Sequence, residues 1–195
     1  MASDRRYLDL SVDELLIELA SPSPVPGSGF AAAVAIAMGA GIVTMAARLS
    51  PDWSEARGAA AQAETLRKRV MELASRNADA YAEALTALKG REEKYRTRNE
   101  TMGDALARAA DVPLEIGDAA TSVAALAAEV ADRGNPRFCA DCAAAASLAV
   151  AAARAAATLV EVNLGTTGED ERVSRARAQM ADASASLEQA LASVA

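Results

Sequence analysis

The chain has 195 residues, which is the length of one domain. It contains 52 alanines but only three tyrosines, two phenylalanines and one tryptophan, so few of its residues favour β-strands. Alanine is a strong helix former, so the composition predicts an all-α fold and nearly excludes an all-β fold. The formal net charge of −7 argues against a nucleic-acid-binding protein, because affinity for phosphates depends on basic residues. Histidine is absent, which excludes a Ser-His-Asp triad and the usual zinc sites, so no metal site is expected.

The first predicted helix is short, and Ser11 and Glu14 form a capping box at its start. Residues 21–29 are rich in proline and glycine and cannot be helical. The second predicted helix covers residues 30–49, and its part from 30 to 47 carries no charge. Most of these residues are alanine or glycine rather than leucine or phenylalanine. We therefore predict a helix buried in a bundle, not a membrane span.

Four more helical segments are predicted, over residues 54–88, about 100–132, 135–163 and 170–194. Pro113 is expected to kink or break the helical segment that ends near residue 132. Asn135 is expected to cap the next helix, with Pro136 at its first position. No strand, repeat or linker is visible in the sequence. It therefore predicts a single domain over residues 1–195, an up-and-down bundle of about six helices.

The proline–glycine segment is the first candidate site. Gly27 and Gly29 have no side chains, so their backbone N–H groups can lie open to a ligand at the start of the buried helix. The spacing fits neither a Walker loop nor a dinucleotide-binding fingerprint. A stiff connection between two helices is the alternative.

Two aspartates are candidate acid–base residues. On a helical wheel Asp141 shares a stripe with Leu159 and Val162, and Asn163 extends that face. A carboxylate on an apolar stripe is costly unless it is paired, but Asp141 could instead lie in a first turn, where its charge favours the helix dipole. Asp79 lies opposite the apolar stripe of its helix, on which the three- and four-residue spacing places Tyr81. It is expected to be solvated unless it faces a cleft or a second subunit.

Two further segments carry reactive or charged residues. Residues 89–99 contain five basic and two acidic side chains. This local positive charge suits an anionic ligand, but such a run is also typical of a solvent-exposed loop. Cys139 and Cys142 lack the context of a redox or zinc motif, so we expect small buried side chains. The N-terminal residues contain no apolar run typical of a secretory signal, and a cytoplasmic protein is expected.

Taken in order, several segments resemble the cyclodeaminase/cyclohydrolase family, which includes the cyclodeaminase half of formiminotransferase-cyclodeaminase and free-standing bacterial methenyltetrahydrofolate cyclohydrolases. Residues 24–29 (Pro-Val-Pro-Gly-Ser-Gly) are similar to the family's Pro-Gly-Gly-Gly-Ser loop, and residues 78–81 (Ala-Asp-Ala-Tyr) to its Asp-Ala-(Tyr/Phe) segment. The other similar pieces are Arg98, Ala105-Leu106, Val112-Pro113-Leu114, Gly134-Asn135 with Asp141, and Val162-Asn163-Leu164.

The resemblance implies an all-helical homodimer that acts on reduced folates without a permanently bound cofactor. One family reaction adds water to 5,10-methenyltetrahydrofolate and gives the 10-formyl form; the other closes 5-formiminotetrahydrofolate and releases ammonia. Both need proton transfer at a carbon between two nitrogens, which a carboxylate can perform. The family match assigns this role to Asp79 first and Asp141 second. It also implies substrate binding by Pro26, Gly27, Ser28, Gly29, Arg98, Asn135 and Asn163.

One position departs from the family pattern. The family's final serine of the glycine loop is Phe30 here. If its ring lines a cleft, it is expected to obstruct or reorient a ligand; the alternative is that the ring fills the core and the loop is only a connection. A non-catalytic binding or scaffold protein that has lost folate turnover is therefore the alternative. Because no formiminotransferase half accompanies the chain, the cyclohydrolase reaction is favoured over the cyclodeaminase reaction. The even apolar character of residues 30–47 also predicts a homodimer, since one bundle leaves part of such a helix uncovered. No membrane or nucleic-acid partner is expected.

Overall fold

The computed structural model describes residues 7–89, 107–165 and 170–194, and within them it contains helices and no strand. The all-α prediction is therefore confirmed. The α-helices are α1 (Val12–Ala20), α2 (Ser28–Arg48), α3 (Ala56–Lys89), α5 (Asp111–Arg133), α6 (Cys139–Leu164) and α7 (Glu171–Ala192), and the 3-10 turns are η1 (Tyr7–Asp9) and η2 (Pro136–Phe138).

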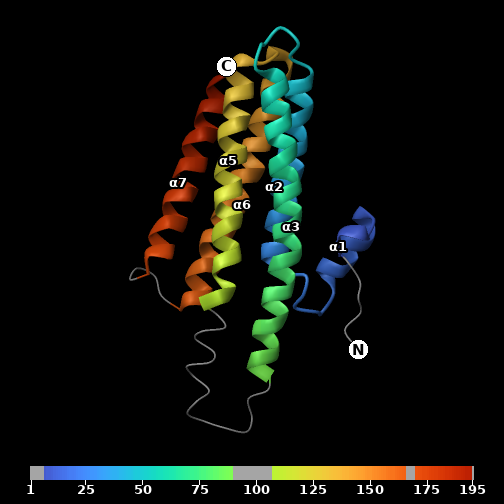
Figure 1. The fold of residues 1–195 in the computed structure, drawn as a ribbon, viewed down its shortest axis with the longest axis vertical. Helices are drawn as coiled ribbons and strands as arrows, with labels where there is room; N and C mark the ends of the chain where they lie inside the picture. The colour runs from blue at the N-terminus through green and yellow to red at the C-terminus, as the bar shows by residue number, and fades with distance from the viewer. Residues whose placement is uncertain (1–6, 90–106, 166–169, 195) are drawn as a thin grey trace.

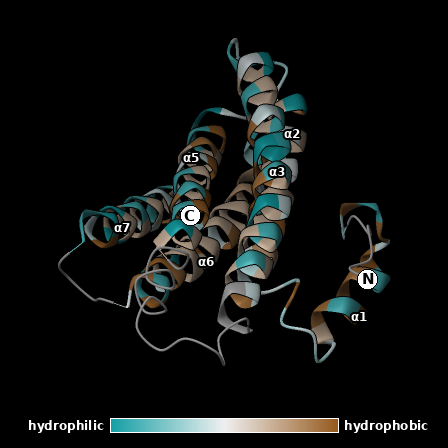
Figure 2. Cartoon of the chain, turned by 60° about the horizontal axis from the view of Figure 1, so that its bottom comes forward, coloured by the Kyte–Doolittle hydropathy of each residue, from teal (hydrophilic) through white to brown (hydrophobic). Residues whose placement is uncertain are grey.

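The long helices run alternately up and down and form one bundle (Figure 1). Helix α5 packs against α2, α3, α6 and α7, and α2 also packs against α3 and α6. Helix α1 lies to one side of the bundle in two views, and none of its residues is buried, although Leu15 packs against the core (Figures 1 and 2). The expected number of helices is confirmed for the described residues, with α1 at the side of the bundle.

Local signals in the sequence fix several helix ends. The Ser11 side chain accepts a hydrogen bond from the Glu14 N–H, and the Glu14 side chain bonds back, so the capping box is confirmed. Asn135 caps η2 as predicted, by accepting a hydrogen bond from the Arg137 N–H. A helical turn ends at Ala110 and α5 begins directly after it, which places Pro113 in the first turn of α5. A proline is tolerated there because the first-turn N–H groups have no intrahelical acceptor.

Small residues make up most of the core and bring the helices close together. Most of the buried apolar residues are alanines; Phe30, Ile36, Leu73 and Ile116 are among the few large ones. A Cβ added at Gly39 of α2 would lie 3.0 Å from the Ala145 carbonyl oxygen of α6. Such an approach of two backbones is possible only where one helix carries a glycine or another very small residue.

Two segments are long and apolar enough to cross a membrane by length and composition, namely Ser28–Arg48 and Pro136–Leu164. In the bundle, 61% and 56% of their apolar windows are buried against other helices. This is what the core helices of a bundle are expected to show. As expected for so evenly apolar a helix, one bundle does not enclose α2 on all sides, because Met38 remains 59% exposed and Met45 is exposed as well.

Candidate active site

A cavity of about 270 Å³ lies at the end of the bundle where α2 begins and α6 ends. Its wall comes from the proline–glycine loop, from α3, from the start of α5 and from the last turns of α6. The lining residues are Pro24, Gly27, Ser28, Gly29, Asn77, Tyr81, Ala109, Pro113, Leu159, Val162 and Asn163. A larger and more open hollow of about 770 Å³, with Arg48, Arg57 and Lys68 in its wall, holds none of the predicted site residues.

Hydrogen bonds hold the proline–glycine loop in place beside the cavity. The Val25 carbonyl oxygen accepts bonds from the Ser23 hydroxyl at 2.7 Å and from the Tyr7 hydroxyl at 3.3 Å. Pro26 is buried behind the lining, and the Val25–Pro26 peptide bond is cis. The loop therefore presents Gly27 to the cavity from a fixed position.

The start of α2 presents backbone donors to the cavity. Gly27 is the N-cap residue and supplies no side-chain cap. The first backbone bond of the helix runs from the Ala31 N–H to the Gly27 carbonyl oxygen at 3.1 Å. The N–H groups of Ser28 and Gly29 therefore have no acceptor within the described part of the chain. These donors, at the positive end of a 21-residue helix, suit a ligand atom that carries negative or partial negative charge.

Asn77 and Tyr81 of α3 lie one helical turn apart and both line the cavity. The Asn77 side chain is only 8% exposed and packs directly on Gly29, where an added Cβ would overlap its carboxamide. Glycine at position 29 is therefore what allows α3 to bring an amide group against the start of α2. Tyr81 is 37% exposed, so it belongs to the mouth of the cavity and not to the core stripe in which its spacing had placed it.

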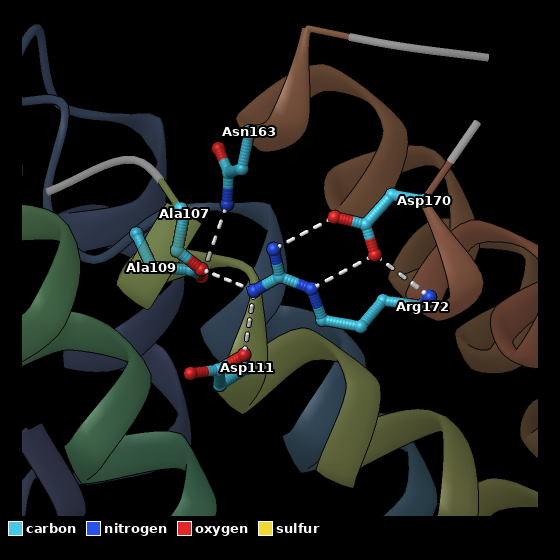
Figure 3. Close-up of polar contacts among 6 residues, drawn as sticks. All are labelled: Ala107, Ala109, Asp111, Asn163, Asp170 and Arg172. Carbon is cyan, nitrogen blue, oxygen red and sulfur yellow. Dashed lines mark hydrogen bonds and ion pairs between the residues drawn. The ribbon is translucent and has the colours of Figure 1, made fainter. Parts of the chain in front are cut away.

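The wall formed by the start of α5 is tied to the end of α6. The Asn163 side chain donates a hydrogen bond to the carbonyl oxygen of Ala109 at 3.1 Å (Figure 3). Ala109 itself lines the cavity. Asn163 thus fixes the distance between two walls and still has a side-chain oxygen that accepts no hydrogen bond within the described residues.

Arg172 of α7 strengthens the same wall. Its guanidinium donates to the Ala107 carbonyl oxygen and to an Asp111 carboxylate oxygen, each at 2.9 Å, and pairs with Asp170 at 2.9 Å (Figure 3). Asp170 also caps α7 through the Arg172 N–H. The bonds from Arg172 lower the pKa of Asp170 to about 2. The residues that enter α5 are therefore held by a charged clamp, defined here as Arg172, Asp170 and Asp111.

Phe30 does not obstruct the cavity. Its side chain is 0% exposed, and its ring meets the edge of Tyr7 with centroids 5.6 Å apart at 69°. The ring fills the core behind the loop and is absent from the cavity wall. The expectation that Phe30 would block a ligand is thus wrong, because the position points into the bundle.

Several predicted site residues meet at this cavity. Gly27, Ser28, Gly29 and Asn163 line it, and Pro26 supports it from behind. Asp79 is exposed and lies outside the lining, although it stands between the two lining residues of α3. Arg98 lies outside the described residues.

Asn135 and Asp141 lie at the other end of the bundle. Asp141 and Asn163 are 22 residues apart on α6, which corresponds to about 33 Å along the helix axis. The Asn135 amide donates to the Leu49 carbonyl oxygen at 3.0 Å, so its side chain serves the turn. Asp141 is exposed in the first turn of α6, and the stripe that it shares with Leu159 is not the core stripe. The alternative of a charge at the helix start is therefore the correct one.

Sequence reasoning missed Asn77 as a lining residue and assigned Tyr81 to the core. The spacing of four residues between them was a usable signal, because it places both on one face of α3. The family match drew attention to Asp79 instead, which lies on another face.

The polar groups of the cavity are backbone N–H groups, two carboxamides, a phenol and a hydroxyl, and the described lining contains no carboxylate. Such a set suits an uncharged polar ring. Neither cysteine belongs to it: burial raises the pKa of Cys142 to about 12, which keeps the thiol protonated and unreactive. Within the described residues, no three acidic or thiol side chains lie close enough together to hold a metal ion.

Comparisons with known proteins identify the family to which the chain belongs. The family model for formiminotransferase-cyclodeaminase matches residues 11–182, and no curated protein gives a significant match. The crystal structure of formiminotetrahydrofolate cyclodeaminase from Thermotoga maritima is similar in fold, with a TM-score of 0.85 at 20% sequence identity. The match covers 97% of this chain and 98% of that one. The chain, whose motifs already resembled this family, belongs to the formiminotransferase-cyclodeaminase family.

Proposed function

We propose that this protein is a folate one-carbon enzyme that hydrates 5,10-methenyltetrahydrofolate or closes 5-formiminotetrahydrofolate. The observation that carries the proposal is the convergence of four separate family segments on one cavity. Its wall receives residues from the glycine loop, from the α3 segment with Tyr81, from the α5 segment with Pro113 and from the α6 segment with Asn163. A reduced folate is the ligand class that the family name and this set of polar groups have in common.

In the cyclohydrolase reaction, the oxygen of water bonds to the methenyl carbon and a proton leaves. The bond from that carbon to N5 then breaks, N5 gains a proton as the added hydroxyl loses its own, and the formyl group remains on N10. In the cyclodeaminase reaction, N10 bonds to the formimino carbon and loses its proton. The formimino nitrogen gains protons, its bond to that carbon breaks, and it leaves as ammonia. Both sequences need a group that takes and returns a proton beside the reacting carbon.

Two residues are proposed for the proton transfer. The family match supports Asp79, which lies on α3 just beyond the lining and is exposed. The geometry of the cavity supports Tyr81, which lies at its mouth. The backbone donors of α2 would stabilise an oxygen that gains negative charge during the reaction.

A homodimer is part of the proposal, because large apolar side chains of the core helices are left uncovered. Met38 of α2 is 59% exposed and Val162 of α6 is 67% exposed. Val162 also lines the cavity, so a second copy that covers it would close the mouth of the site. Sedimentation at micromolar concentration should show a dimer, and Met38→Glu should shift it to a monomer with lower turnover. A wild-type monomer would refute this part.

The test of the function is to mix the purified protein with methenyltetrahydrofolate and follow its near-ultraviolet absorption. The expected result is a loss of the methenyl band faster than in the same buffer with heat-denatured protein. Parallel reactions with formiminotetrahydrofolate should be followed by the appearance of the methenyl band and by ammonia release. Acceleration of neither reaction would refute the enzymatic proposal.

A non-catalytic folate-binding protein is the second candidate. The observation that favours it is the lack of a carboxylate in the described lining. Tight folate binding without acceleration of either reaction would support this candidate. Absence of both binding and turnover would refute both candidates.

A further inference from the structure

Asn77 is the exception among the buried polar side chains of the described residues. The others, Thr44, Ser50 and Gln179, each form hydrogen bonds inside the bundle, to the Ala40, Ala46 and Leu114 carbonyl oxygens respectively. Asn77 is 8% exposed, and its carboxamide forms no hydrogen bond within the described part of the chain. Its nitrogen and oxygen are not sealed in the core but reach the cavity that the residue lines. A carboxamide that lines a cavity and has no partner inside the chain is available to bind a polar group of a ligand.

The surroundings of the Asn77 carboxamide fix its orientation. It lies against Gly29, so closely that no side chain fits between them. On the open side it faces the cavity, where the unpaired N–H groups of Ser28 and Gly29 also lie. The Asn77 carboxamide therefore offers an acceptor, its Oδ1 atom, and a donor, its Nδ2 group, next to the backbone donors at the start of α2.

This pattern is complementary to a cyclic amide. A carboxamide presents an acceptor and a donor side by side, and a ring N–H next to a ring carbonyl presents the matching pair. The pteridine ring of a reduced folate carries such an amide edge on its pyrimidine half, away from the bridge carbon that reacts. A volume of about 270 Å³ lies at the small end for ligand pockets, which suits a bicyclic ring but not a whole folate.

We propose that Asn77, together with the N–H groups at the start of α2, binds the amide edge of the pteridine ring and thereby selects reduced pterins. The inference rests on the proposed function, because it assigns the deep part of the same cavity. The aminobenzoyl-glutamate part of the ligand then extends through the mouth past Tyr81.

The test compares the full chain with the variants Asn77→Ala and Asn77→Asp, and with Gln62→Ala as a matched control. Gln62 is an exposed amide on the same helix, 15 residues away, or about 22 Å along the axis. Binding is measured by calorimetry with three probes: methenyltetrahydrofolate, 6-methyltetrahydropterin, which lacks the tail, and p-aminobenzoylglutamate, which lacks the pterin.

Both Asn77 variants should weaken binding of the tetrahydropterin at least tenfold and leave binding of p-aminobenzoylglutamate unchanged. Gln62→Ala should bind all three probes as the wild type does. Without ligand, Asn77→Ala should melt at about the wild-type temperature, because the Asn77 carboxamide forms no hydrogen bond within the described residues. Gly29→Ala should displace the carboxamide and cause a similar loss, and the Gly29→Ala/Asn77→Ala double variant should lose little more than either single one.

Wild-type turnover of methenyltetrahydrofolate with unchanged tetrahydropterin affinity in Asn77→Ala would overturn the inference and leave the proposed function standing. Earlier melting of Asn77→Ala with unchanged affinity would show that the residue is only structural. Binding of no probe and no turnover by the wild type would overturn the proposed function and the inference with it. If Asn77→Ala fails to fold, the tetrahydropterin affinities of the Asn77→Asp and Gly29→Ala variants decide whether the inference holds.

Discussion

Replacement of Phe30 by serine should destabilise the bundle without improving ligand binding. The Phe30 side chain is fully buried and packs edge-to-face on Tyr7. Truncation of such a side chain costs about 3–5 kcal/mol. The aromatic pair contributes about 0.5–1.5 kcal/mol beyond burial, which places this site at the upper end of the range. Because the ring is absent from the cavity wall, folate affinity should stay at the wild-type value.

Urea denaturation followed by circular dichroism measures the loss, with Phe30→Leu as the control. Leucine keeps much of the buried volume, so this control should lose less than about 1.5 kcal/mol. Folate affinity is measured on both variants at a temperature where each is folded. A Phe30→Ser protein with wild-type stability and tighter folate binding would refute the reasoning, because it would show that the ring faces the ligand.

Four other predictions concern the site and its clamp. Asp79→Asn should lower turnover about a hundredfold or more and change the free energy of unfolding by less than about 1 kcal/mol. Unchanged turnover would leave Tyr81 as the candidate for proton transfer, and Tyr81→Phe would then test it. Arg172→Ala should raise the KM for folate by loosening the α5 wall, and Arg172→Lys should restore only part of the affinity; equal KM values would contradict the clamp. The folded pKa of Asp170, about 2, lies below its usual 3.8, so its contribution to stability is complete above the usual value and is lost as the pH falls through 2. Acid titrations of the urea midpoint should therefore be flatter in Asp170→Asn. A thiol reagent at pH 8 should label Cys142 only after unfolding.

Much of the fold could be predicted because local signals and composition agree. Alanine content fixes the helical class, and the Ser11 capping box and the Asn135 turn mark their helix starts as expected. The glycine loop could also be singled out from the sequence, because glycines leave their backbone N–H groups uncovered, and in the structure the loop lines a cavity. These features depend on contacts between neighbours in the sequence.

The errors arose where the outcome depends on tertiary packing. Helix α6 has alanines on both its buried and its exposed sides, so the wheel gives little contrast and the few large residues, such as Leu159 and Val162, pointed to the wrong face. Asn77 could not be distinguished from any other polar residue of α3, because only the folded chain shows that it is buried and unpaired. The position of Phe30 was ambiguous for the same reason.

The alanine-rich core reverses the usual pattern of mutational sensitivity. A buried alanine has almost no side chain to lose, so truncation to glycine mainly costs helix propensity, about 1 kcal/mol. Enlargement is a different matter, because backbones that approach as closely as Gly39 and Ala145 leave no room for an added methyl group. A saturation scan of α2, α5 and α6 should therefore find that gains of volume are tolerated least. In this bundle, steric overlap in the core limits which substitutions are accepted more than the creation of cavities does.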